Sequence, residues 1–260
     1  MKRDLARYER DYVNVPFEQT MTQVRKRMLL DFIGRHQFRK LLEAGCADKP
    51  LFTILEEFDS FVVVEPGKAF CANARALANI HPHADRIQIF NRTFEEFHGN
   101  APVDCVILSS LLHELEDPEA MVDHAFQLVP PGCWLHVDVP NAKSFHRLWA
   151  REAGLIKTEY QKSDIQIRMQ QNHTFDLDSL TALVKEAGFV IAESGSYLIK
   201  PFTHAQMQHL LDLGILTEDL ITGLMKMEKY IPGLGAEIFV NAQKPSRPER
   251  PRSSQKLMIP

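Results

Sequence analysis

A glycine and a carboxylate, 20 residues apart, are the pair of residues in this sequence best placed to bind a ligand. Gly45 follows a short apolar segment, and Glu65 ends a second one that reads FVVV. A glycine after a strand lets the backbone approach a ligand closely, and a carboxylate after the next strand accepts two hydrogen bonds from a vicinal diol. The spacing is typical of a βαβ unit that binds the ribose of a nucleotide. Dinucleotide folds have three glycines where this turn has one, so the turn alone is a weak signal.

Alternating strand-like and helix-like segments would position this pair. The segments 38–43 and 61–64 are apolar and too short for helices, which predicts strands covered on both faces. Between them we expect a helix over 50–58 with Pro50 at its first position, where a missing N–H costs nothing. We also expect strands at 86–90, 103–108, 134–139, 189–194 and 236–242, and helices at 4–12, 18–33, 66–80, 118–129, 144–153, 177–187, 203–213 and 217–231. The fold class is therefore α/β: a Rossmann-like, seven-stranded, mostly parallel sheet with helices on both faces and the last strand antiparallel.

Four stretches, in the right order, resemble the motifs of class I S-adenosylmethionine (SAM) dependent methyltransferases. They are Glu43-Ala-Gly-Cys-Ala-Asp-Lys for the first motif, Glu65-Pro-Gly for the acidic end of the second strand, DCVILSSLLHELEDP over 104–118 for the fourth strand, and LVPPGCWL over 128–135 for the run into the fifth. The resemblance is good over 32–139 and looser onward to about 242. The first glycine motif is degenerate, because Ala47 and Lys49 replace its second and third glycines. The fourth-strand motif has His113 before Glu114, where the family often has the reverse order.

The resemblance implies SAM as the cofactor and no metal. Glu43 would accept hydrogen bonds from the cofactor's ammonium group and Glu65 from its ribose hydroxyls. The segment 91–97 would contact adenine, with Phe94 either stacked on the base or part of the core. The cofactor-binding residues predicted in this way are Glu43, Gly45, Cys46, Ala47, Glu65, Pro66, Thr93, Phe94, Ser109 and Ser110.

Methyl transfer from a sulfonium is an in-line displacement, and it needs a base only when the acceptor must lose a proton. The candidate bases are His113, just past the fourth strand, and His146 and His173 in the polar segment 140–175. Each of these also suits a hydrogen-bonded structural histidine. Arg147 and Arg168 would bind an anionic substrate group by two-pronged contacts, or are ordinary surface arginines. The predicted substrate-binding residues are Tyr12, Phe17, His113, Asn141, His146, Arg147 and Arg168.

By analogy with the family, residues 1–36 form an N-terminal helical lid, and residues 37–243 form the SAM-binding domain. The alternative for the helix within 18–33 is plain packing on the sheet with its basic side, Arg25 to Arg27, in water. The domain contains a substrate-region insertion at about 140–175 and helices at about 203–231, and together with the lid the insertion forms a helical cap. Residues 244–260 are expected to be a disordered basic tail.

Composition excludes several function classes. The chain has 260 residues with a net charge of −4, and since residues 244–260 carry +4, the body carries −8 and does not suit a nucleic-acid surface. Its four cysteines show no CxxC spacing, which argues against zinc, and reduced thiols fit a cytoplasmic protein. No signal peptide and no apolar run long enough for a bilayer is visible, so no membrane partner is expected.

These observations predict a SAM-dependent methyltransferase that acts on an O or N atom of a small molecule, such as a secondary metabolite or a sugar-like compound. One alternative is a methyltransferase-like binding or scaffold protein without turnover, for which Ala47 and Lys49 are the best support. The other is an NAD-dependent oxidoreductase, which Glu65 would suit but which the missing glycines disfavour. The apolar stripes of the helices at 203–231 suit either the core or a homodimer surface.

Overall fold

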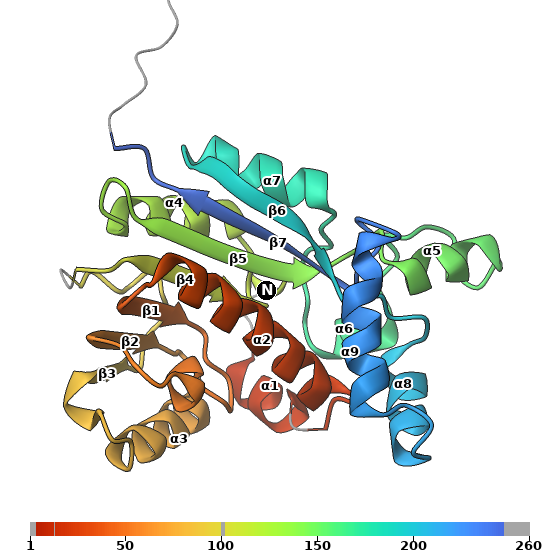
Figure 1. Ribbon diagram of the computed structural model, residues 1–260, viewed down its shortest axis with the longest axis horizontal. Helices are drawn as coiled ribbons and strands as arrows, with labels where there is room; N and C mark the ends of the chain where they lie inside the picture. The colour runs from red at the N-terminus through yellow and green to blue at the C-terminus, as the bar shows by residue number, and fades with distance from the viewer. Residues whose placement is uncertain (1–3, 13, 100–101, 247–260) are drawn as a thin grey trace, which may run out of the picture.

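The computed structural model describes residues 4–12, 14–99 and 102–246. These residues form a sheet of seven strands in the order β3-β2-β1-β4-β5-β7-β6 (Figure 1). The strands are β1 (Lys40–Ala44), β2 (Ser60–Val64), β3 (Ile87–Phe90), β4 (Cys105–Ser109), β5 (Trp134–Pro140), β6 (Val190–Tyr197) and β7 (Glu237–Gln243). Neighbouring strands from β3 to β5 pair in parallel, whereas β7 is antiparallel to both β5 and β6. The predicted sheet, with its antiparallel last strand, is confirmed.

The helices bury alternate faces of these strands. They are α1 (Leu5–Tyr12), α2 (Glu18–His36), α3 (Lys68–Asn79), α4 (Pro118–Leu128), α5 (Phe145–Glu152), α6 (Asp164–Arg168), α7 (Leu177–Glu186), α8 (His204–Asp212) and α9 (Glu218–Lys226), with 3₁₀ turns η1 (Leu51–Ile54), η2 (Ala84–Arg86), η3 (Leu112–Glu114) and η4 (Met227–Lys229). Leu41 packs in one apolar cluster with α2 and α3, while its neighbour Leu42 packs in another with α4 and α7. Successive strand residues point to opposite faces, so continuous apolar runs become strands buried on both sides.

Helix starts follow the capping chemistry of the sequence. Asp117 accepts the N–H of Ala120 and Pro118 opens α4, while Thr203 and Gln206 form a reciprocal capping box on α8. Thr217 caps α9. A third apolar cluster joins the start of α2 to α8 and α9, through residues such as Met21, Met207 and Ile221. Leu213, Ile215 and Leu220 stay exposed, and their pairing with a second chain stays a prediction.

The helix expected over 50–58 is wrong, because only the four-residue turn η1 forms there. Leu55 already has extended backbone, with φ −88° and ψ 126°. The chain must return along the full length of β1 before β2 begins at Ser60. A helix advances only about 1.5 Å per residue, against about 3.3 Å for extended chain. A helix of nine residues would therefore leave too few residues between β1 and β2 to reach the start of β2. Leu51, Phe52 and Phe58 are still fully buried, which explains the misleading apolar spacing.

Two further expectations need correction. The basic side of α2 does not all face water, because Arg25 is buried and ion-paired. The segment after α5, expected as a loop, contains α6 with its own capping box. The tail expected at 244–260 falls almost wholly outside the described residues. None of the described helices is long and apolar enough to cross a membrane.

Candidate active site

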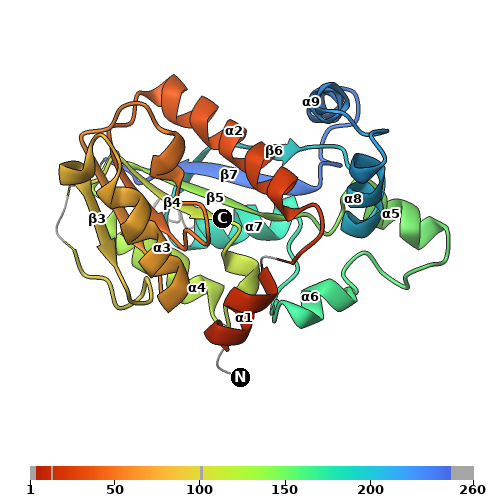
Figure 2. The same cartoon turned by 90° about the horizontal axis from the view of Figure 1, so that it is seen from below.

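A cavity of about 220 Å³ lies at the edge of the sheet where the parallel strands end. Strands β1, β2, β4 and β5 contribute their carboxyl ends, and β7, which runs the other way, contributes its first residue, Glu237. Helices α1 and α2 line it from one side and the segment from α5 to α6 from the other (Figure 2). This edge is where open α/β sheets bind ligands.

The turn after β1 and the end of β2 are joined by one carboxylate. The N–H groups of Cys46 (2.9 Å) and Ala47 (3.3 Å) donate to Oε2 of Glu65, and the N–H of Gly67 donates to Oε1 (2.7 Å). Gly45 has φ 75°, which favours glycine, and a Cβ there would meet Leu111 at 3.4 Å. Ala47, at the position of the family's second glycine, also has positive φ, 48°. The backbone of the glycine motif is thus kept although its second glycine is lost.

Two buried carboxylates line this half of the cavity. Burial raises the pKa of Glu65 to about 7, although its backbone hydrogen bonds lower it. Burial likewise raises the pKa of Glu43 to about 7, while the N–H of Leu51, which donates to it at 2.9 Å, acts in the opposite direction. Both groups therefore change charge near neutral pH, and a ligand that donates hydrogen bonds to them would favour the ionised forms.

A buried polar network supports the loop after β4. Ser109 Oγ donates to Asp138 (2.8 Å), and the N–H of Ser110 donates to the same carboxylate (3.0 Å). His136 lies 2.8 Å from Asp138 and 2.6 Å from Asn241 through its two ring nitrogens. Burial alone would raise the pKa of Asp138, but the contacts with His136 hold this pKa below its ordinary value. Ser109 and Ser110 line the cavity as predicted, held by an aspartate that the sequence did not single out.

All three predicted bases line the cavity. His113 is buried in η3, and its backbone carbonyl accepts the N–H groups of Asn172 and His173. His146 lies at the start of α5, with Nδ1 3.1 Å from Ser144 Oγ. Burial, followed by the charge of Lys200, lowers the pKa of His146 well below its ordinary value, so this ring is neutral at pH 7. Nε2 of His173 is 3.3 Å from the carbonyl oxygen of Glu116.

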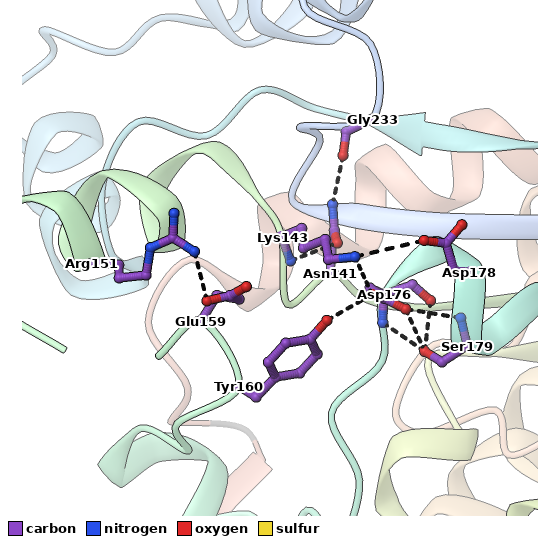
Figure 3. A network of polar contacts seen from close by, with 9 residues as sticks. All are labelled: Asn141, Lys143, Arg151, Glu159, Tyr160, Asp176, Asp178, Ser179 and Gly233. Atoms are coloured by element: carbon purple, nitrogen blue, oxygen red, sulfur yellow. Dashed lines mark hydrogen bonds and ion pairs between the residues drawn. The ribbon is translucent and has the colours of Figure 1, made fainter. Parts of the chain in front are cut away.

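Asn141 and Arg147, two of the predicted substrate-binding residues, line the cavity and also hold the surrounding backbone. Figure 3 shows the amide of Asn141 donating to the carbonyl of Gly233 (3.0 Å). The same amide also donates to the carbonyl of Gly235 (2.9 Å). Arg147 lines the cavity, but its guanidinium donates to the carbonyls of Glu159 and Gln161 and so holds the loop before α6. A two-pronged contact of Arg147 with substrate is therefore not what the structure shows.

Four predicted ligand contacts do not line the cavity. Phe17 is 1% exposed and packs with α8 and α9, while Phe94 is 3% exposed and lies in the core against the ring of His124. Thr93 lies beyond the edge strand β3, and Arg168 is exposed at the end of α6. The other predicted residues, Pro66 and Tyr12 among them, do line it. Position in the sequence predicts that these residues lie near the cavity, but packing determines whether each side chain points into it.

A group of charged residues that no motif of the sequence predicts lies in the half of the cavity next to β5, β7 and β6. Arg25 lies 2.5 Å from Glu18 and 3.9 Å from Glu237, and all three line the cavity. Lys200 follows β6 and is 1% exposed. The sequence pattern that identifies Glu65, a charged residue next to an apolar strand, also occurs here. Lys200 ends the segment YLIK before Pro201, and Glu237 lies in AEIFV at 236–240. No group of three or more metal-ligating side chains occurs within the described ranges.

Fold and site together define a methyltransferase of the Rossmann-like class. A family model described as a methyltransferase domain matches residues 17–194, and the chain belongs to that family, the class I SAM-dependent methyltransferases. Among curated proteins, none matches the sequence significantly.

Solved structures share the fold at low sequence identity. A SAM-dependent methyltransferase from Thermotoga maritima has a TM-score of 0.57 and 18% identity, over 92% of this chain and 98% of that one. The N-methyltransferase NodS from Bradyrhizobium japonicum, in complex with S-adenosylhomocysteine, has a TM-score of 0.53 and 13% identity, over 86% of this chain and 87% of that one. The [4+2]-cyclase SpnF has a TM-score of 0.52 and 14% identity, over 80% of this chain and 74% of that one. Since SpnF is named as a cyclase, the fold alone does not determine the reaction.

Replacing Ala47 by glycine should stabilise the protein. The left-handed backbone costs a residue with a Cβ about 1–2 kcal/mol, part of which the greater freedom of unfolded glycine offsets. We expect a gain of about 0.5–1 kcal/mol in the free energy of unfolding, measured by urea denaturation. Ala76→Gly on the exposed side of α3 is the control and should cost about 1 kcal/mol. A loss in Ala47→Gly as large as in the control would contradict the strain at this turn.

The network of Figure 3 predicts a local role for Asp176. This residue caps α7 and receives Lys143 (2.5 Å) and the hydroxyl of Tyr160 (2.7 Å). Asp176→Ala should cost about 1–2 kcal/mol and expose the loop before α6 to limited proteolysis. Asp178→Ala removes an exposed carboxylate 3.7 Å from the same lysine and should change stability by less than about 0.5 kcal/mol. Equal effects of the two substitutions would argue against the network.

Proposed function

We propose that this protein transfers a methyl group from SAM to an O or N atom of a small molecule. The observation that carries the proposal is Glu65, a buried carboxylate at the end of β2 that lines the cavity and faces the turn at Gly45. A carboxylate has about four lone-pair positions, so Glu65 keeps one for a ribose hydroxyl beside its three backbone donors. Glu43 offers a second acceptor for the cofactor's ammonium group.

The cofactor would supply an activated methyl group, and the chain's own residues would position the acceptor and exclude water. His113 is our candidate base, because it is buried in the cavity wall directly after β4. It would take the proton of a hydroxyl or ammonium acceptor. His146 is less suited to this role, since its lowered pKa makes it a weak base. His173 would act at the rim of the cavity.

The N-terminal helix has the contacts expected of a lid. Glu9 Oε1 accepts the N–H of Ala69 (2.8 Å) at the start of α3, and Gln170 exchanges hydrogen bonds with the backbone of Asp4. Tyr8 and Tyr12 pack on Phe70 and line the cavity. The cavity of about 220 Å³ is below the range of about 300–1,000 Å³ usual for ligand sites. We infer that α1 moves away to admit cofactor and acceptor.

The structure also bears on the oxidoreductase alternative. A pyrophosphate is bound by backbone N–H groups at the N-terminus of the helix after β1. Here β1 is followed by η1, whose first N–H groups include that of Leu51, already donated to Glu43. This supports a cofactor without a pyrophosphate.

The first experiment is calorimetric titration of the purified protein with S-adenosylhomocysteine, beside NAD. We expect micromolar binding of S-adenosylhomocysteine, at least tenfold weaker in Glu65→Gln, and no binding of NAD. Glu56→Gln, an exposed carboxylate before β2, is the matched control and should bind as the native protein does. Binding of S-adenosylhomocysteine without turnover across a panel of hydroxyl and amine acceptors would favour the scaffold alternative. Binding of NAD alone would overturn the proposal.

The affinity for S-adenosylhomocysteine should also depend on pH. Glu65 has a pKa of about 7 before ligand binds, and ribose hydroxyls donate to its ionised form, so binding releases a proton. From pH 6 to pH 8 the ionised fraction of Glu65 rises about tenfold, and the affinity should rise by at least that factor because Glu43 titrates in the same range. In Glu65→Gln the remaining dependence should come from Glu43, whose pKa is also about 7. A native affinity that falls as pH rises over this range would refute the role of Glu65.

A further inference from the structure

Lys200 is a buried cation in the wall of the cavity. It follows β6, is 1% exposed, and lines the half of the cavity opposite Glu65. Its one recorded hydrogen-bond partner within the described part of the chain is Nδ1 of His204, at 2.8 Å, and no described carboxylate lies within 4.0 Å of its Nζ. When Lys200 is protonated it donates to that nitrogen, so the proton of His204 lies on Nε2. A buried ammonium normally requires an ionic partner.

No carboxylate of the described residues forms a direct ion pair with Lys200, although the charges of Glu237 and Glu18 act to raise its pKa. Arg25 takes Glu18 at 2.5 Å and lies 3.9 Å from Glu237. Arg147, a nearby cation, is committed to backbone carbonyls. The charged and titratable groups that face Lys200 come from α2, α5, α8 and β7: they are Glu18, Arg25, His146, Arg147, His204 and Glu237. Burial shifts the pKa values of three of these six groups, His146, His204 and Glu237, toward the neutral form. This end of the cavity is therefore rich in hydrogen-bond donors.

We propose that Lys200, with His146 and His204, forms a subsite for a carboxylate group of the methyl acceptor. This proposal rests on the proposed function, since it places the acceptor in the half of the cavity that the cofactor residues leave free. A carboxylate there would receive charge-assisted hydrogen bonds from the ammonium and from the ring N–H groups. It would complete the ion pair that Lys200 lacks among its described neighbours, and it would fix the acceptor with its other end toward the loop after β4.

Proton linkage gives the subsite a measurable signature. Burial lowers the pKa of Lys200 to about 7, so at pH 8 most of this group is neutral before an anion binds. A bound carboxylate favours the ammonium form, and binding therefore takes up a proton. Burial raises the pKa of Glu237 to about 8, and an anion nearby favours its neutral form as well. Both effects make carboxylate affinity fall as pH rises from 6.5 to 8.5, by roughly tenfold or more.

The test uses the full chain and benzoate as probe, with benzamide and benzylamine as neutral and cationic counterparts, in ligand-observed NMR titrations with and without S-adenosylhomocysteine. We expect benzoate to bind at least tenfold tighter than either counterpart, and Lys200→Met to lose at least tenfold in benzoate affinity. Lys185→Met, at an exposed position on α7, is the matched control and should behave as the native protein. Lys200→Met should still bind S-adenosylhomocysteine, which separates failure of this subsite from failure of the proposed function.

Equal binding of benzoate and benzamide, no binding of either, or tighter binding of benzylamine would overturn the subsite. Inorganic phosphate is a further arm, and tighter binding of phosphate than of benzoate would overturn the assignment to a carboxylate. If Lys200→Met fails to fold, as judged by circular dichroism, the pH profile of the native protein decides. A benzoate affinity that is flat or rises between pH 6.5 and 8.5 would then refute the role of Lys200.

Discussion

The constraint on which this site depends is the burial of charge at the end of a sheet. Almost every strand brings a polar or charged group to the cavity: Glu43 near the end of β1, Glu65 after β2, Ser109 at the end of β4, Asn141 after β5, Lys200 after β6 and Glu237 at the start of β7. Taking such groups out of water is costly, so each is stabilised by a partner or shifts toward its neutral form. Glu65 binds three backbone N–H groups, and Asn141 binds two carbonyls. Lys200 makes its hydrogen bond to His204 and has no direct ion pair among the described residues, which is why we propose that a ligand's anionic group completes it.

The two halves of the cavity solve this problem differently. In the half under β1 and β2, backbone N–H groups of the turn satisfy Glu65, so the carboxylate also fixes the turn that would hold the cofactor. In the half under β5, β7 and β6, side chains from distant segments meet: α2 supplies Arg25, β7 supplies Glu237 and α8 supplies His204. The first arrangement is local in sequence and tolerates the loss of a glycine at Ala47 for about 1 kcal/mol of strain. The second arrangement depends on packing between α2, β7 and α8, which are far apart in the sequence.

This difference explains what the sequence could predict. Gly45, Glu43 and Glu65 were found because the strand, turn and strand that position them are contiguous, and the sheet followed from the apolar periodicity. The helical periodicity of α2 predicts Arg25 on its water-facing side, because the sequence of this helix does not show that Glu237 of β7 packs beside Arg25. Phe94 follows the end of the third strand and Phe17 belongs to the expected N-terminal lid, but both side chains turn inward to the core. The helix over 50–58 failed because periodicity does not reveal the length that a connection must span.

The family match sharpens this division. It covers residues 17–194, which include β1 to β5 and the cofactor half, and it ends before Lys200, His204 and Glu237. The strand β7 lies between β5 and β6, and this order brings residues 200–237 beside the end of β5. A fold that also occurs in a [4+2]-cyclase has to vary its reaction through what surrounds the common half. In this chain Lys200, His204 and Glu237 of the charged half lie beyond the match, whereas Glu18, Arg25 and His146 lie within it. On the proposed function, Lys200, His204 and Glu237 would take part in the choice of acceptor, and the topology determines their positions although no motif predicts their identities.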